Sequence, residues 1–171
     1  MADHILIRYG ELALKKSNRK QFINRINKSI KRALESYENL EFDPRGLRFY
    51  IILNNNPYLE EIIEILKKIP GIYSFSVVSK CNSNIDDIVN LAETLLKDEF
   101  KTGMKTIKVD TNRGDKHFPM TSLEITKEVS RQLFKRIEGL KADVHNPELT
   151  LHLDVRFEGT FIFTNIIMGM G

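Results

Sequence analysis

Four side chains that could together bind a nucleotide lie within six positions of one another near the middle of the chain. They are Arg113, Lys116, His117 and Phe118. Two cations, an imidazole and an aromatic ring can neutralise a phosphate and stack on the base attached to it. The backbone N–H groups at the start of a following helix would add to such an anion site. An ordinary solvated loop, with Phe118 in the core, fits the same pattern, so both interpretations remain open at this point.

The flanking residues predict how this loop is held. A strand is predicted over residues 107–112, where apolar and polar side chains alternate. Thr121 followed by Glu124 has the spacing of a helix capping box, and Met120 with Ile125 has that of a hydrophobic staple. The sequence therefore predicts a strand, a basic loop and a helix, with the loop pinned at both ends. Asp115 and Glu124 oppose anion binding, because each carboxylate repels phosphate.

A second basic stretch lies near the N-terminus. Residues 15–32 contain eight Lys or Arg and no Asp or Glu. A helix is predicted from Ser17 or Asn18 to about Tyr37, with an apolar stripe at helical spacing and a basic opposite face. A solvated outer face and a phosphate-binding face are both consistent with this pattern. The local absence of acids makes this stretch a stronger indication of a nucleic-acid partner than the net charge of +3.

Composition excludes several classes of protein. The chain has 171 residues, of which 42% are hydrophobic and 29% charged, as in ordinary globular domains. No apolar run is long enough to span a bilayer, and no signal peptide opens the chain. Cys81 is the single cysteine, so no internal disulfide can form; this fits a cytoplasmic protein, and no metal-ligand spacing is present. Because no phosphate loop or nucleophile–base pair is found either, we expect this stretch to bind rather than to catalyse.

The order of predicted elements suggests two α/β domains. Residues 1–78 read as βαββαβ, the ferredoxin-like arrangement, with a turn at residues 43–46. Residues 79–84 read as a polar linker, and residues 79–171 as a second α/β (α+β) domain. Its last predicted strand runs over residues 160–168. The chain then ends in Met168-Gly169-Met170-Gly171, which we interpret as an interdomain junction cut short; a natural C-terminus is the alternative interpretation.

Two stretches together resemble one family. Residues 9–22 (YGELALKKSNRKQF) are similar to the opening of the tRNA 4-thiouridine synthetases, also called ThiI thiamine-biosynthesis sulfurtransferases. Residues 112–122 (NRGDKHFPMTS) are similar to the central motif of the THUMP domain in that family. The resemblance covers the whole chain, as a ferredoxin-like domain followed by a THUMP RNA-binding domain. Lys16 departs from the family, which usually has glycine there.

The resemblance implies a tRNA-binding function divided between the two domains. The THUMP motif would hold the single-stranded 3′ CCA end of tRNA. The residues expected there are Asn112, Arg113, Lys116, His117, Phe118 and Ser122. The ferredoxin-like domain would contact the acceptor stem. The residues expected there are Lys15, Lys16, Asn18, Arg19 and Lys20.

For a longer parent protein, the resemblance implies an ATP-dependent, cytoplasmic tRNA sulfurtransferase. Such a parent would use ATP and Mg²⁺ in a further PP-loop domain to form 4-thiouridine at position eight of tRNA. It would be a homodimer supplied with persulfide sulfur by a cysteine desulfurase, with a link to thiamine biosynthesis. Residues 1–171 would need no cofactor and no membrane. Two alternatives remain: a stand-alone RNA-binding adaptor, and a regulatory module that binds a small metabolite in a closed apolar pocket.

Overall fold

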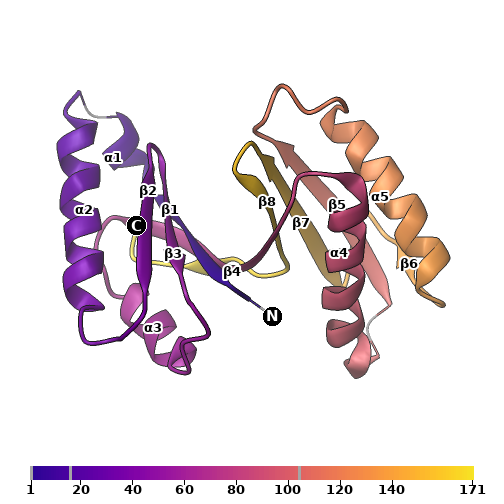
Figure 1. Ribbon diagram of the computed structural model, residues 1–171, viewed down its shortest axis with the longest axis horizontal. Coiled ribbons are helices and arrows are strands. Elements are labelled where there is room, and N and C mark those ends of the chain that lie inside the picture. The colour runs from indigo at the N-terminus through magenta and orange to yellow at the C-terminus, as the bar shows by residue number, and fades with distance from the viewer. Residues whose placement is uncertain (1, 16, 104) are drawn as a thin grey trace. The chain divides into compact units, whose positions relative to one another are not determined.

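The computed structural model describes residues 2–15, 17–103 and 105–171 (Figure 1). Contacts divide them into two compact units. The first unit is Ala2–Val78 together with Asn165–Gly171, and the second is Ser79–Thr164. The boundaries predicted from the sequence, 1–78 and 79–171, differ from this division in the last seven residues, which pack with the first unit.

The first unit has the predicted βαββαβ order, with one short extra helix. Its elements are β1 (His4–Tyr9), α1 (Glu11–Lys15), α2 (Arg19–Ala33), β2 (Glu41–Arg45), β3 (Arg48–Ile52), α3 (Leu59–Leu66), β4 (Ile72–Cys81) and, late in the chain, β9 (Ile167–Met168). The strands pair in the antiparallel order β2-β3-β1-β4, and β9 adds to β4. Figure 1 shows α2 and α3 on the same face of this sheet.

Helix α2 turns its apolar stripe to the sheet and its cations outward. Ile23, Ile26 and Ile30 are buried in the first core, against the alternate residues of β1 that begin with Ile5. The Tyr9 hydroxyl of β1 donates a 2.6 Å hydrogen bond to Asn27 Oδ1 on the same stripe. Burial raises the pKa of Tyr9 to about 12, so the hydroxyl keeps its proton and stays a donor. This hydrogen bond and the buried isoleucines turn the same face of α2 toward the sheet.

Two predictions in the first unit were wrong in detail. Residues 43–45 were predicted to form a turn, but they belong to β2, and the chain reverses at Gly46 and Leu47. Pro44 is tolerated because β2 is an edge strand, where a missing N–H leaves no ladder bond unmade. The helix predicted to reach Tyr37 ends at Ala33. Leu34 is nevertheless buried, so the apolar stripe continues one residue beyond the end of the helix.

The second unit places two helices on one face of a mixed sheet. It contains α4 (Ile85–Glu99), a 3₁₀ turn η1 (Phe100–Thr102), β5 (Thr106–Arg113), α5 (Ser122–Arg136), β6 (Lys141–Ala142), β7 (Leu149–Arg156) and β8 (Gly159–Phe163). Strand β5 is parallel to β6 and β7, and β7 is antiparallel to β8. Figure 1 shows α4 and α5 beside these strands, and their buried faces share one core with β5, β7 and β8. The predicted mixed α/β class is confirmed for both units.

The predicted linker and the predicted last strand were both wrong. Ser79–Cys81 continue β4 and pair with β8, so only Asn82–Asn84 connect this strand to α4. The apolar run over residues 160–168 is not one strand, because Phe161 and Ile162 belong to the second unit while Ile167 packs with the first core. Asn165 lies at the break, where its side chain exchanges hydrogen bonds of 2.8 and 2.9 Å with the backbone of Val77.

Candidate nucleic-acid interface

The predicted basic loop lies at one edge of the second unit's sheet. Because β5 and β7 are parallel, with Arg113 opposite Val155, their carboxyl ends meet at the same edge. The loop between β5 and α5, residues 114–121, leaves that edge and is called here the β5–α5 loop. The two-residue turn between β7 and β8, Phe157 and Glu158, leaves it as well. In sheets with parallel strands, ligands commonly bind outside the carboxyl ends.

Hydrogen bonds from backbone N–H groups hold the β5–α5 loop at both ends. At its start, the N–H groups of Gly114 and Asp115 donate to Val155 O at 2.8 and 3.1 Å. At its end, Thr121 Oγ1 accepts from the N–H of Glu124 at 3.2 Å, and Glu124 Oε1 accepts from the N–H of Thr121 at 2.9 Å. The capping box is confirmed. The Thr121 N–H is also the main cause that lowers the pKa of Glu124, to which the charge of Arg113 adds.

Arg113 shapes the loop from inside. Its Nη1 donates to Phe118 O at 3.3 Å and to Met120 O at 3.4 Å. The guanidinium therefore ties down two carbonyl groups of the loop, and part of its hydrogen-bonding capacity is used within the chain. Arg113 acts first as a positioning residue, and its positive charge lies directly beneath the loop backbone.

Lys116 and His117 form the exposed part of the loop. The backbone N–H of His117 donates to Asp115 Oδ1 at 3.0 Å, which turns the chain outward at this point. Within the part of the chain that the structure describes, neither of the two side chains has a hydrogen bond or an ion pair. Both are exposed and accessible to an anion.

Phe118 is a core residue. Its side chain is 8% exposed and belongs to the cluster that also contains Ile125 and Val155. The hypothesis that it offers an open stacking face does not fit this position, because the ring packs beneath the start of α5. Ser122, the first residue of α5, is half-buried beside it, and no hydrogen bond of its side chain is found among the described residues.

A buried carboxylate organises the strand ends next to the loop. Asp154 is 3% exposed and accepts from Asn112 Nδ2 at 3.2 Å and from Arg156 Nε at 3.2 and 3.3 Å. The guanidinium of Arg156 lies over Gly114, where an added Cβ would be 3.1 Å from its Cζ. Asn112 is thus a partner of Asp154. Arg156 is a further cation at this edge and was not among the predicted site residues. The sequence showed only that it lies at the end of an alternating strand.

The first unit presents its cations differently. Lys15 pairs with Glu11 at 3.5 Å, and both side chains are largely exposed. Asn18 precedes α2 as its N-cap residue but makes no side-chain cap bond, and Arg19 and Lys20 are exposed in the first turn. Lys16 lies outside the described residues.

The remaining basic residues of α2 are also exposed. They are Arg25, Lys28, Lys31 and Arg32. Across residues 17–103 and the other described parts of the chain, none of the six cations of α2 forms an ion pair. Of the basic stretch predicted from residues 15–32, the part that lies on α2, from Arg19 to Arg32, therefore presents exposed cations without an ion-pair partner among the described residues.

Comparisons with known proteins identify both units. Residues 4–76 match the family model of the ThiI ferredoxin-like domain, and residues 82–165 match that of the THUMP domain. The chain carries a ThiI ferredoxin-like domain followed by a THUMP domain. The resemblance stated from the two sequence stretches is confirmed.

Three similar proteins place this pair of domains in a wider context. A relative from Thermoanaerobacter pseudethanolicus named "Probable tRNA sulfurtransferase" is 39% identical over 171 residues, which is 100% of this chain and 43% of the relative. A protein of the same name from Bacillus subtilis is 38% identical, over 99% of this chain and 42% of its own length. The crystal structure of a 4-thiouridine synthetase–RNA complex with bound ATP matches with a TM-score of 0.80 and 27% identity, over 100% of this chain and 43% of that one. The chain thus spans less than half the length of these proteins.

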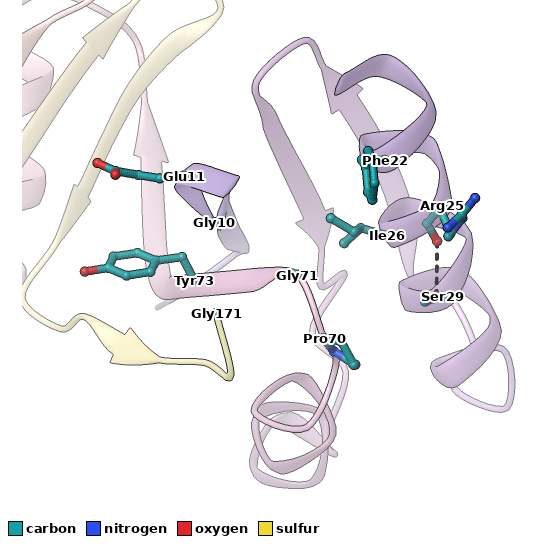
Figure 2. A pocket seen from close by; sticks show the side chains of 10 residues that line it. All are labelled: Gly10, Glu11, Phe22, Arg25, Ile26, Ser29, Pro70, Gly71, Tyr73 and Gly171. Carbon is teal, nitrogen blue, oxygen red and sulfur yellow. Dashed lines mark hydrogen bonds between the residues drawn. The ribbon is translucent and has the colours of Figure 1, made fainter. Parts of the chain in front are cut away.

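The ThiI ferredoxin-like domain also contains a hollow beside α2 (Figure 2). Its volume is about 850 Å³, and its lining includes Phe22, Arg25 and Ile26 of α2 together with Gly71 and Tyr73. Gly71 has φ +97°, and an added Cβ would lie 2.5 Å from Ile26 Cδ1. Only glycine therefore allows the chain to pass this close to the helix. The hollow combines apolar walls with the charged groups of Arg25 and Glu11.

Two further findings concern the described residues as a set. No three His, Cys, Asp or Glu side chains among residues 2–15, 17–103 and 105–171 lie close enough to hold a metal ion. None of the helices that the structure describes has the length and apolar character of a membrane span.

Proposed function

We propose that this chain binds tRNA, with the THUMP domain holding the single-stranded 3′ CCA end. The observation that carries the proposal is the β5–α5 loop: a rigid backbone, capped at Thr121, that presents the unpaired side chains of Lys116 and His117. Unpaired RNA ends are recognised through their phosphates and splayed bases, and a preorganised basic edge suits that mode. Arg113, Asn112 and Ser122 contribute by shaping this edge.

The ThiI ferredoxin-like domain contributes the contact with the acceptor stem. The major groove of an RNA helix is too deep and narrow for side chains, so a protein contacts a stem mainly through its phosphates and 2′-hydroxyls. Lys15 ends α1, and Arg19 and Lys20 lie in the first turn of α2. These three cations can neutralise stem phosphates without reading the sequence. Lys16 and Asn18 complete the predicted set.

The longer protein implied by the relatives is proposed to be a tRNA sulfurtransferase. It would form 4-thiouridine at position eight of tRNA with ATP and Mg²⁺, and would receive persulfide sulfur from a cysteine desulfurase. A cytoplasmic homodimer and a link to thiamine biosynthesis belong to the same proposal. Residues 1–171 alone should transfer no sulfur and hydrolyse no ATP, which an assay of the purified chain with tRNA, ATP and a persulfide donor checks.

The experiment that tests tRNA binding is a titration of the purified chain with intact tRNA and with the same tRNA lacking its CCA end. We expect micromolar affinity for intact tRNA, weaker affinity for the trimmed form, and a steep decrease of both with salt. Each phosphate contact contributes a log–log slope of about −0.7 to −0.9. Equal affinities for the two tRNAs would contradict CCA recognition, and a slope near zero would contradict phosphate contact.

A second candidate function rests on the hollow beside α2. A volume of about 850 Å³ with apolar walls and an arginine fits a small anionic metabolite, which a regulatory module would bind. Isothermal titration with a panel of nucleotides and aromatic acids tests it, with Ser29→Trp as the variant that places a ring in the hollow from an exposed position of its lining. Stoichiometric binding that Ser29→Trp abolishes, without loss of tRNA affinity, would favour this function. The stand-alone adaptor remains a third interpretation, and a reading frame that continues past Gly171 would contradict it.

A further inference from the structure

Among the described residues of the THUMP domain, the most exposed large apolar side chain lies at the same edge as the β5–α5 loop. Phe157 is 88% exposed and occupies the turn between β7 and β8, next to Arg156. It belongs to neither core cluster. A phenylalanine left in water forgoes the free energy that burial of its ring would contribute. The ring therefore adds little to the stability of this fold.

Turn chemistry does not account for a phenylalanine at this position. Two-residue hairpin turns favour Asn, Asp and Gly, because these residues adopt the required backbone angles. Here the turn is Phe157-Glu158, and the glycine, Gly159, follows it with φ +147°. Isolated exposed apolar residues are common on protein surfaces, so exposure alone assigns no role. What distinguishes Phe157 is the rigidity of its support and the charge around it.

The support of the turn is fixed by contacts on both strands. Ser83 Oγ donates to Arg156 O at 2.7 Å and lies 2.9 Å from Thr160 Oγ1, so one side chain joins the two arms of the hairpin to the start of α4. Arg156 pairs with Gly159 across the hairpin. An added Cβ at Gly159 would lie 3.1 Å from Cys81 O, which shows how closely the hairpin packs on β4. Because the backbone of the turn is fixed, only the side chain of Phe157 has to be ordered when a ligand binds.

Cations lie at the same edge of the sheet as this turn. Arg156 precedes it in the chain, and its guanidinium lies over Gly114, at the start of the β5–α5 loop that carries Lys116 and His117. The carboxylate of Asp154 is already occupied by Arg156 and Asn112. An exposed aromatic ring on a fixed turn at a basic edge is an arrangement that can bind single-stranded nucleic acid by stacking and phosphate contact together.

We propose that Phe157 is the stacking platform for an unpaired base of the RNA 3′ end, while Lys116 and His117 contact its phosphates. This inference rests on the proposed tRNA binding and deepens it. It assigns base stacking to a residue 35 positions beyond the end of the motif at residues 112–122, and it replaces the buried Phe118 in that role.

The chain contains no tryptophan, so Phe157→Trp introduces a single fluorophore at the proposed contact. Intact tRNA should quench its fluorescence, and tRNA lacking the CCA end should not. Val144→Trp is the matched control: Val144 is 61% exposed in the same domain, but lies between β6 and β7, where β7 starts rather than ends. Equal quenching of both variants, or no quenching of Phe157→Trp at saturating tRNA, would overturn the assignment.

A double-mutant cycle measures the stacking directly. The affinities of wild type, Phe157→Ala and Phe157→Leu are measured for an acceptor minihelix and for three forms that each lack one base of the CCA end. Removal of the stacked base should weaken wild type about 5- to 150-fold, the equivalent of about 1–3 kcal/mol. The same removal should leave Phe157→Ala and Phe157→Leu nearly unchanged, because leucine keeps apolar surface but no ring. Unchanged thermal unfolding checks that the variants are folded.

The possible outcomes distinguish a failure of the role of Phe157 from a failure of the proposed tRNA binding. If wild type binds no RNA, both are overturned. If wild type discriminates the CCA end and Phe157→Ala discriminates it equally, tRNA binding stands and the role of Phe157 is overturned. If Phe157→Leu retains the full base dependence, the contact is apolar rather than aromatic, and stacking is overturned.

Discussion

The two basic regions of this chain use the same residue types in opposite ways. On α2 of the ThiI ferredoxin-like domain, six exposed cations project from one helix and none has an ion-pair partner among the described residues. At the β5–α5 edge of the THUMP domain, Arg113 and Arg156 are held by hydrogen bonds within the chain, and Lys116 and His117 remain exposed. The helix offers more charge, and the edge offers fixed geometry.

This difference indicates different kinds of contact. Long lysine and arginine side chains on a helix face move independently and adapt to any phosphate backbone, so their contribution is electrostatic and decreases with salt. Hydrogen bonds that fix a loop lower the entropy lost on binding and allow it to recognise one local shape. We therefore expect α2 to supply most of the affinity and the THUMP edge most of the discrimination.

The largest expected effect comes from the end of α1 and the first turn of α2. Replacing Lys15, Arg19 and Lys20 by alanine should weaken binding roughly tenfold or more and reduce the salt slope by up to about 0.9 for each phosphate that is no longer neutralised. Intact and CCA-trimmed tRNA should be affected alike. Filter binding over a salt series measures both quantities. The control is Lys31→Ala with Arg32→Ala at the other end of α2; an equal loss of affinity there would show that the whole helix field acts, and not a local contact.

The next largest effect is expected at the β5–α5 loop, where two variants distinguish a contribution to binding from one to stability. Arg113→Ala with Lys116→Ala should remove most of the preference for intact over trimmed tRNA. Of the single variants, Arg113→Ala should lower the free energy of unfolding by about 1–3 kcal/mol, because two loop carbonyls lose a charged donor. Lys116→Ala should stay within about 0.5 kcal/mol of wild type. Urea unfolding and tRNA titration test the pair, and a folded double variant that keeps its full preference would show that this loop is not the CCA site.

A smaller effect on stability is expected at the N-caps of α5 and α2. Thr121→Ala should destabilise the protein by about 1 kcal/mol, since the hydroxyl caps the N–H of Glu124. Asn18→Ala should change stability by less than about 0.5 kcal/mol, because this N-cap residue makes no side-chain cap bond. Thermal unfolding measures both. Of the two variants, only Thr121→Ala should also reduce the ratio of the affinities for intact and trimmed tRNA. A larger loss of stability in Asn18→Ala than in Thr121→Ala would contradict the view that the β5–α5 loop is the more rigid region.

The smallest effect is a pH dependence of the capping box. Hydrogen bonds from Thr121 lower the folded-state pKa of Glu124 below its ordinary value of 4.5. A lowered folded pKa means that this contribution to stability is present above about pH 4.5 and is lost as the pH falls through the folded pKa. The stability difference between wild type and Glu124→Ala should thus shrink as the pH falls below 4.5. Urea unfolding between pH 6 and 3 measures it, and a difference independent of pH would contradict the role of the carboxylate.

Local interactions account for what could be predicted from the sequence alone. The capping box at Thr121 and Glu124 joins residues three positions apart, so its geometry follows from the helix itself. The apolar stripe of α2 and the alternation in β7 follow the periods of a helix and a strand. They correctly predict that Ile23, Ile26 and Ile30 of α2, and Leu151, Leu153 and Val155 of β7, are buried. The two motif stretches were enough to predict the family, and the βαββαβ order of elements was enough to predict the fold of the first unit.

Only the tertiary structure decided the roles that depend on distant neighbours. Phe118 is core and Phe157 is exposed because of how α5 and the β7–β8 turn pack, and nothing within a few residues of either ring distinguishes them. The two carbonyl partners of Arg113 depend on the path of the loop, and Arg156 reaches Gly114 only because β5 and β7 lie parallel and adjacent. The break at Asn165 also depends on Val77, 88 positions away. Sequence periodicity reports which face of an element is buried, but the partner that buries it is set by the pairing of strands and the packing of helices.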